Sequence, residues 1–109
     1  MGKDSTSFIY HDITKQYPEV MEAWEKLGAT VRSAGPLDEK TSHLIQLAAA
    51  AASRSEGAVH SHARRARNAG ASREEIQHTL LLLISTIGFP QAMAALSWCQ
   101  DIFKGENGE

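Results

Sequence analysis

The sequence predicts an all-α fold for this 109-residue chain, a single-domain helical bundle of about five to six helices. Apolar residues recur every three or four positions through most of the chain, which is the spacing of one helix face. Gly and Pro separate these segments, and no alternation typical of strands is present. We expect a helical core over residues 17–104, between a polar N-terminal lead over residues 1–16 and a frayed tail over residues 105–109. So short a chain buries only a modest core by itself, which a partner subunit could complete.

The first two expected helices are bounded by helix-breaking and helix-capping residues. The first begins at Pro18 and ends at Gly35. Its apolar side chains fall on one stripe, which holds Val20, Met21, Trp24, Leu27 and Val31. The second begins after Asp38, a suitable N-cap, and stops near Ser53 after an alanine run over residues 48–52. A face of alanines lets a neighbouring helix approach closely.

The third and fourth expected helices meet at a glycine and a capping box. The third opens at Ser55 and ends at Gly70, a residue type suited to the left-handed position after a helix. Ser72 and Glu75 have the spacing of a capping box for the fourth helix. The fourth is apolar nearly all round over residues 76–87, so we expect it to be central or to lie in a subunit interface.

The fifth expected helix begins at Pro90 and carries Cys99, the only cysteine of the chain. A single cysteine cannot run a dithiol cycle within one subunit. It also fits a reducing compartment, where disulfide frameworks are rare. We therefore expect a cytoplasmic protein.

Composition and charge argue against nucleic acid and membranes as partners. The net charge of −2 supplies no field that would gather nucleic acid or an anionic membrane surface. The first seven residues lack the apolar stretch of a secretory signal. The longest apolar runs, over residues 44–52 and 80–84, are far shorter than the roughly 20 residues of a membrane span. We expect a soluble protein with no nucleic-acid and no membrane partner.

Two neighbouring histidines of the third helix are expected to point in different directions. At about 100° per residue, His60 and His62 differ by roughly 200°, so they cannot face one ligand together. We place His60 with Arg64 and Arg67 on the solvent face. His62 instead borders the small-residue stripe of this helix.

His62 shares one flank of the third helix with Ser55 and Ala58, because the three residues are spaced by three and four. This flank starts at a helix N-terminus, which favours anions and can lower a neighbouring pKa. The residues alone leave a second interpretation open, in which His62 is a hydrogen-bonded histidine at the edge of the core and Ser55 is a simple N-cap.

The stretch from Leu37 to Pro90, about half of the chain, resembles the carboxymuconolactone decarboxylase and alkylhydroperoxidase D-like superfamily. The resemblance is carried by LDEKTSHLIQLAAAAASRSEG, HSHARRARNAGASREEIQHTLLLLI and GFPQAM. The thiol branch of that superfamily has a Glu and, twelve positions later, Cys-x-x-Cys-x-x-x-His. Here His62 matches the histidine, while Ser55, Ala58 and His43 stand at the two cysteine positions and the glutamate position. Without both sulfurs, the dithiol chemistry of that branch is not expected to transfer.

The chain looks closer to the carboxymuconolactone decarboxylases proper, which also lack the cysteine pair. They keep the histidine in a phrase similar to SHARRA and have a Gly-Trp-Pro-like turn resembling residues 88–90. The resemblance implies decarboxylation or lactone rearrangement of a small carboxylated ring, with a trimer or a hexamer as the assembly. Such chemistry needs a proton donor and acceptor, for which we assign His62 and His43, and cationic help from Arg54 or Arg65.

The predicted pocket holds His62 and His43 as catalytic residues, with Ser55, Ala58, Arg65 and His78 around them. His78 is interpreted either as a buried structural histidine, the interpretation we favour, or as a third pocket group. We expect no cofactor and no metal, although His43, His62 and His78 come from different helices and a shared ion was considered. The expected substrate is a small organic molecule, an anionic one among the options.

Two alternative functions stay open from the sequence. The first is an antioxidant role of the alkylhydroperoxidase or peroxiredoxin kind, carried out without a cysteine pair of its own. The second is an oligomeric binding module that kept the fold and lost catalysis. A formed site that joins His62 and His43 would favour the enzyme, whereas a filled and dry site would favour the module.

Overall fold

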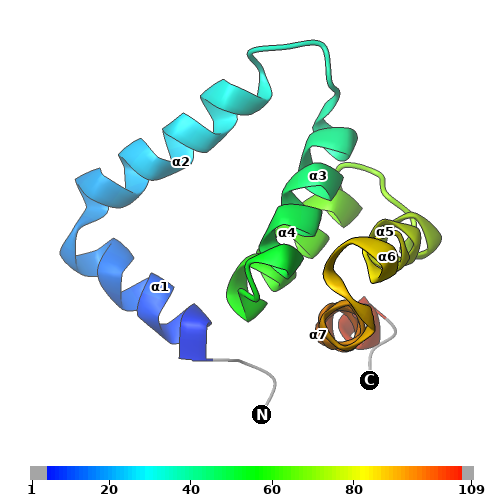
Figure 1. Ribbon diagram of the computed structural model, residues 1–109. Coiled ribbons are helices and arrows are strands. Elements are labelled where there is room, and N and C mark those ends of the chain that lie inside the picture. The colour runs from blue at the N-terminus through cyan, green and yellow to red at the C-terminus, as the bar shows by residue number, and fades with distance from the viewer. Residues whose placement is uncertain (1–4, 107–109) are drawn as a thin grey trace. The chain divides into compact units, whose positions relative to one another are not determined.

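The computed structural model describes the backbone of residues 5–106 and the side chains of residues 8–106, and this part of the chain is all-α as predicted. Figure 1 shows its seven helices. They are α1 (Ser5–Gln16), α2 (Pro18–Arg32), α3 (Glu39–Ala52), α4 (Glu56–Asn68), α5 (Arg73–Leu81), α6 (Ile84–Ile87) and α7 (Phe89–Glu106). The helices fall into two units that divide between Asp38 and Glu39. The expectation of one single domain therefore stays a prediction.

The first unit contains α1 and α2. The expected polar lead is helical from Ser5, where a short cluster of apolar residues gave no periodic signal. The Tyr10 hydroxyl donates a hydrogen bond to the Glu25 carboxylate, and the Tyr10 ring meets the Trp24 ring edge-on with 6.4 Å between centroids. Pro18 occupies the first turn of α2, as predicted. Tyr10 thus joins the two helices through an aromatic contact and a polar contact.

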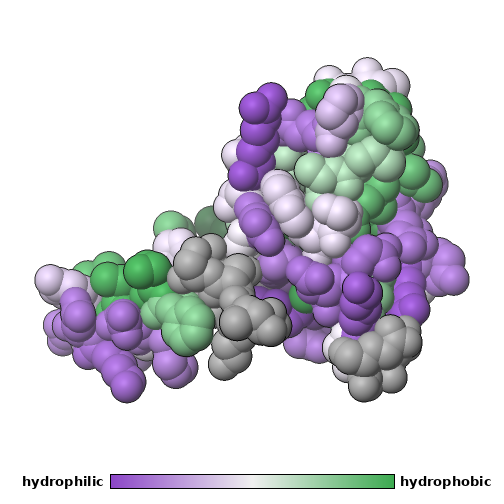
Figure 2. Space-filling view, turned by 90° about the horizontal axis from the view of Figure 1, so that it is seen from below, coloured by the Kyte–Doolittle hydropathy of each residue, from purple (hydrophilic) through white to green (hydrophobic). Residues whose placement is uncertain are grey.

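The apolar stripe of α2 lies at the surface of this unit. Its large members Val20, Trp24, Leu27 and Val31 are each more than half exposed, and α2 has no fully buried residue. Figure 2 shows hydrophobic surface of the protein in green. The helix is therefore amphipathic, as its sequence predicts, with an apolar face that reaches the surface.

The second unit, residues 39–109, is built around the close packing of α3 against α4 (Figure 1). The alanine run of α3 makes this approach possible because its side chains are small. Helices α5 and α7 complete the core. The buried apolar cluster consists of Leu47, Ala50, Ala51, Val59, Ala63, Ala66, Ala71, Ile76, Leu80, Ala95, Cys99 and Phe103.

The start of α5 has the predicted capping box. The Glu75 backbone N–H donates to the Ser72 hydroxyl at 3.0 Å, and the Ser72 N–H donates to the Glu75 carboxylate at 2.8 Å. Lys40 on α3 donates to the same carboxylate at 3.0 Å. Hydrogen bonds from Ser72 and Lys40 lower the pKa of Glu75. Just before the box, Gly70 adopts the left-handed φ of +104° that its position predicts.

The long apolar helix predicted over residues 76–87 is divided in two. Helix α5 ends at Leu81, and Leu83 donates its N–H to the Leu80 carbonyl three residues back, which tightens the chain into a turn before α6. Leu81 and Leu82 are exposed, so the segment is not buried all round within one chain. Gly88, with a φ of +101°, then separates α6 from α7.

Helix α7 runs beyond the boundary expected for it. Gly105 and Glu106, assigned above to a frayed tail, belong to its last turn, and the other residues of that tail lie outside the described part of the chain. Glu106 is held by Arg67 of α4 through two hydrogen bonds of 2.7 and 2.8 Å. Among the helices of residues 5–106, none combines the length and apolar composition that a membrane crossing requires.

Candidate functional site

The structure brings the two predicted catalytic histidines together. Their Nδ1 atoms are 3.4 Å apart, and their ring centroids are 5.6 Å apart with a tilt of 37°. His43 comes from the first half of α3 and is 1% exposed, whereas His62 on α4 is half-buried. One ring of the pair donates its Nδ1–H to the other ring, so the tautomers of the two histidines are coupled.

Glu39, whose side chain is 72% exposed, lies beside the His43 end of this pair. Its carboxylate lies 3.8 Å from Nε2 of His43, one helical turn earlier on α3. In the tautomer of His43 that carries its proton on Nε2, that proton faces the Glu39 carboxylate and Nδ1 of His43 accepts the Nδ1–H of His62. His62 then carries its lone pair on Nε2, the nitrogen of a general base.

Glu39 was missed in the sequence analysis. Its signal was present, because Glu39 precedes His43 by four residues, and such residues are neighbours on a helix. The superfamily pattern includes position 43 but not the helical turn before it, so the pattern does not point to Glu39.

Ser55 acts as the N-cap of α4. Its hydroxyl accepts the backbone N–H of Ala58 at 3.4 Å, which confirms the N-cap interpretation of this residue. Ala58 is half-buried and packs against the core cluster. Both cysteine positions of the thiol branch are therefore occupied by groups with structural contacts.

The arginines and the remaining histidine of the predicted pocket lie in different surroundings. Arg65 is half-buried on α4, three residues after His62 and so on the same side of the helix. Arg54 sits in the turn after α3 with a left-handed φ of +58°, and its Nε donates to Gln91 at 3.2 Å. His78 is exposed on α5, so the expectation of a buried histidine there is wrong for the single chain. The buried side of α5 is carried by Ile76 and Leu80.

Cys99 is sealed in the core on α7. Burial, with a smaller contribution from the charge of Asp101, raises the pKa of its thiol to about 12. At neutral pH the group is therefore a protonated, inaccessible thiol, and such a thiol is neither a nucleophile nor a peroxide reductant.

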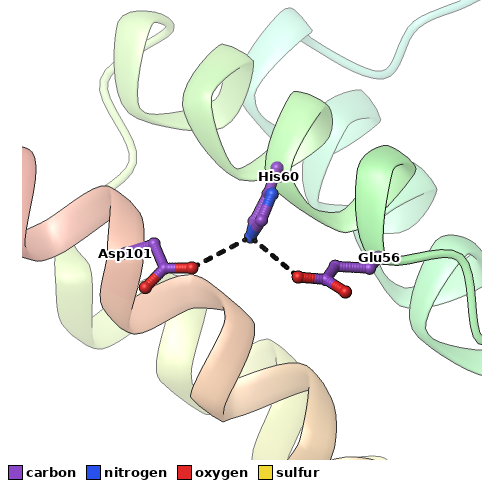
Figure 3. Close-up of side chains that lie close together, drawn as sticks. All are labelled: Glu56, His60 and Asp101. Atoms are coloured by element: carbon purple, nitrogen blue, oxygen red, sulfur yellow. Dashed lines mark ion pairs between the residues drawn. The ribbon is translucent and has the colours of Figure 1, made fainter. Parts of the chain in front are cut away.

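His60 is buried, which corrects its expected position on the solvent face. Its Nε2 lies 3.5 Å from the Asp101 carboxylate of α7 and 4.0 Å from the Glu56 carboxylate, one turn earlier on α4 (Figure 3). Helix periodicity correctly separates His60 from His62. It does not reveal that α7 packs over the His60 side of α4.

A cleft of about 380 Å³ lies between α4 and α7, on the side of His60. It is lined by Arg64, Arg67, Asn68, Asp101, Ile102, Gly105 and Glu106. None of the residues assigned to the histidine pocket from the sequence lines this cleft. The chemistry of the pair makes it the stronger candidate for a catalytic site, because two imidazoles in contact can pass a proton between them, whereas Arg67 and Glu106 of the cleft are held in an ion pair with each other.

Comparison with known proteins agrees with the fold and with the sequence around the pair. The crystal structure of apo-lpg0406, a carboxymuconolactone decarboxylase family protein from Legionella pneumophila, is similar with a TM-score of 0.76 and 27% identity, over 91% of this chain and 88% of that one. An uncharacterized protein of Haemophilus influenzae is 37% identical over 67 residues; the matched region is 59% of each chain and so spans less than two thirds of that relative. The model of the carboxymuconolactone decarboxylase family matches residues 18–101. The chain therefore belongs to the carboxymuconolactone decarboxylase family.

Proposed function

We propose that the protein carries out acid/base chemistry without a thiol at the His43–His62 pair, as a lyase or isomerase acting on a small carboxylated molecule. The observation that supports this most directly is the 3.4 Å contact between one buried and one half-buried imidazole. Family membership supports the class of substrate, because decarboxylation and lactone rearrangement both move protons next to a carboxylate.

In this proposal His62 exchanges the proton with the substrate. Its ring is the more accessible of the two, and Nε2 is the basic nitrogen when Nδ1 donates to His43. When His62 takes up a proton, the imidazolium is stabilised by the acceptor Nδ1 of His43 and, through that ring, by the carboxylate of Glu39. His43 and Glu39 therefore act as positioning residues for His62.

The same ring serves both proposed reactions. In a decarboxylation, the bond between the carboxylate carbon and its neighbour breaks, the electron pair stays on the neighbouring carbon, and protonated His62 delivers a proton there. In a lactone rearrangement, neutral His62 removes a proton from one carbon and returns it to another. Arg65, on the same side of α4, is the proposed partner of the substrate carboxylate, since Arg54 is already held by Gln91.

The antioxidant alternative is less well supported. It requires a thiolate, and the only cysteine is buried in the core with a pKa of about 12. A pair of imidazoles transfers protons and supplies no electrons for reducing a peroxide.

Assembly into a homo-oligomer, a trimer or a hexamer, is part of the proposal. The apolar stripe of α2 in the first unit is exposed, and so are Leu81 and Leu82 in the second unit. Each is the kind of apolar surface that a second copy covers. Light scattering on the purified full chain gives the mass that decides this point, and a monomer at micromolar concentration would contradict it.

The experiment that tests the proposed chemistry measures the release of CO₂ and the loss of lactone from carboxymuconolactone and related lactone carboxylates. We expect His62→Gln to lower turnover at least about 100-fold, the usual contribution of general acid/base catalysis. His11→Gln, which alters an exposed histidine of α1 outside the predicted pocket, is the matched control and should retain activity. Full activity in His62→Gln would refute the proposed role, and no turnover of any such substrate by the wild-type protein would favour the binding module.

A further inference from the structure

Three side chains from two helices meet on the other side of α4. Glu56 and His60 lie one turn apart on α4, and Asp101 approaches them from α7 (Figure 3). Each offers one ligand atom, and the three atoms all lie within 4.8 Å of one another. We propose that Glu56, His60 and Asp101 bind a divalent transition-metal cation of the zinc class between α4 and α7.

The separations of the ligand atoms fit the edges of a coordination shell. Zinc binds imidazole nitrogen and carboxylate oxygen at about 2.0–2.2 Å, which gives a ligand-to-ligand edge of about 3.4 Å in a tetrahedron. Nε2 of His60 is 3.5 Å from the Asp101 oxygen and 4.0 Å from the Glu56 oxygen. Both distances exceed those of an ordinary hydrogen bond and require only a small movement of the carboxylates toward a shared ion.

The burial of the three groups separates a fixed ligand from two adjustable ones. His60 is 7% exposed, and its neighbour Val59 belongs to the core that fixes α4 against α7. The Glu56 and Asp101 side chains are 46% and 62% exposed, so they can rotate onto an ion at little cost. Asp101 also lines the cleft between α4 and α7, through which an ion and its remaining water ligands have access.

The donor set indicates which cations fit. One imidazole nitrogen with two carboxylate oxygens suits Zn²⁺, Co²⁺, Mn²⁺ or Fe²⁺, whereas Ca²⁺ and Mg²⁺ prefer oxygen ligands alone. Two carboxylates neutralise the two positive charges of the ion. A cation held here joins α4 to α7 and stabilises the folded chain by mass action, because the unfolded chain does not hold the three groups together.

The test titrates ZnCl₂ into the full-length, tag-free protein by calorimetry and follows the melting temperature in parallel. Co²⁺ absorption reports the ligand set. We expect one Zn²⁺ per chain and a rise in melting temperature. Asp101→Asn and Glu56→Gln, which alter exposed groups and preserve the fold, should each weaken binding at least about tenfold, since even loss of an outer partner of a metal ligand commonly costs that much. His60→Gln should abolish binding.

Two matched control variants distinguish this site from zinc binding elsewhere on the chain. Glu74→Gln removes an exposed carboxylate from α5, and His62→Gln removes a histidine from the other side of α4; both variants should bind Zn²⁺ like the wild type. No zinc-dependent heat or stabilisation in the wild-type protein, or equal affinity in Asp101→Asn, would overturn the proposal. Loss of binding in His62→Gln together with retention in Asp101→Asn would overturn it as well, because the ion would then lie at the histidine pair.

Discussion

Cys99 and His62 are the two residues whose surroundings decide between redox and proton-transfer chemistry. Cys99 lies in the core of the second unit, while His62 is half-buried and in contact with His43. A group that reacts with a substrate must be reached by it in the right protonation state. Only the histidine meets this requirement in the described structure, since the thiol is both buried and protonated.

The reactivity of Cys99 can be measured without knowing the substrate. With a pKa of about 12, only about one thiol in ten thousand is ionised at pH 8. We expect native protein to react with a thiol reagent such as iodoacetamide orders of magnitude more slowly than protein unfolded in guanidinium chloride. Rapid, stoichiometric labelling of the folded chain would contradict the structure and revive the antioxidant alternative.

For single residues, the sequence predicts the side chain that contacts His62 but not the one that contacts His60. His43 comes from the superfamily pattern, and its contact with His62 is present in the structure. The partner of His60, Asp101, lies 41 positions later on another helix, so local spacing carries no sign of it. Arginines on the same side of α4 also favoured the prediction of a solvated face. Local periodicity cannot report that a residue is buried by a helix far away in the sequence.

Capping and glycine geometry set the boundaries of most helices. The Ser72–Glu75 capping box starts α5, and Gly88 with its left-handed φ separates α6 from α7. The Glu75 carboxylate also forms an ion pair with Lys40 of α3. The same carboxylate therefore caps α5 and links it to α3. The cap is expected to contribute about 1 kcal/mol to the free energy of unfolding.

The capping box makes stability depend on pH in a defined direction. The folded-state pKa of Glu75 lies below that of the unfolded chain, so its contribution is fully present above the ordinary carboxyl pKa of about 4.3 and is lost as pH falls through the lowered folded value. In urea denaturation between pH 7 and 3, we expect Glu75→Gln to be less stable than the wild type at pH 7 and to lose less stability on acidification. Glu74→Gln, outside the box, is the control. An unchanged pH profile in Glu75→Gln would argue against the capping contact.

The elements marked by Pro, Gly or a cap could be predicted from the sequence, and the others could not. Helix α2 begins at Pro18 as expected, and α4 begins after its Ser55 cap. The division between α5 and α6 has no breaking residue, because Leu82 and Leu83 are both good helix formers. Helix α1 has a short apolar cluster in place of a stripe, so its sequence resembles a polar lead.

At the scale of the whole molecule, family membership and the all-α fold rest on features distributed along the chain. The family match over residues 18–101 includes helices from both units. The sequence could predict the fold class because helical periodicity and the superfamily phrases agree. Neither the exposed stripe of α2 nor the cleft between α4 and α7 follows from those phrases, because both depend on how helices pack.

The most direct test of the central claim locates the bound substrate among the five histidines of the chain. Titration of ¹⁵N-labelled protein with a lactone carboxylate, followed through the imidazole ¹⁵N resonances, reports every histidine separately. We expect saturable shifts at His43 and His62, with His11 and His60 as internal references that do not move. Saturable shifts at His60 alone, on the side of the α4–α7 cleft, would place the ligand elsewhere and contradict the assignment of the histidine pair as the functional site.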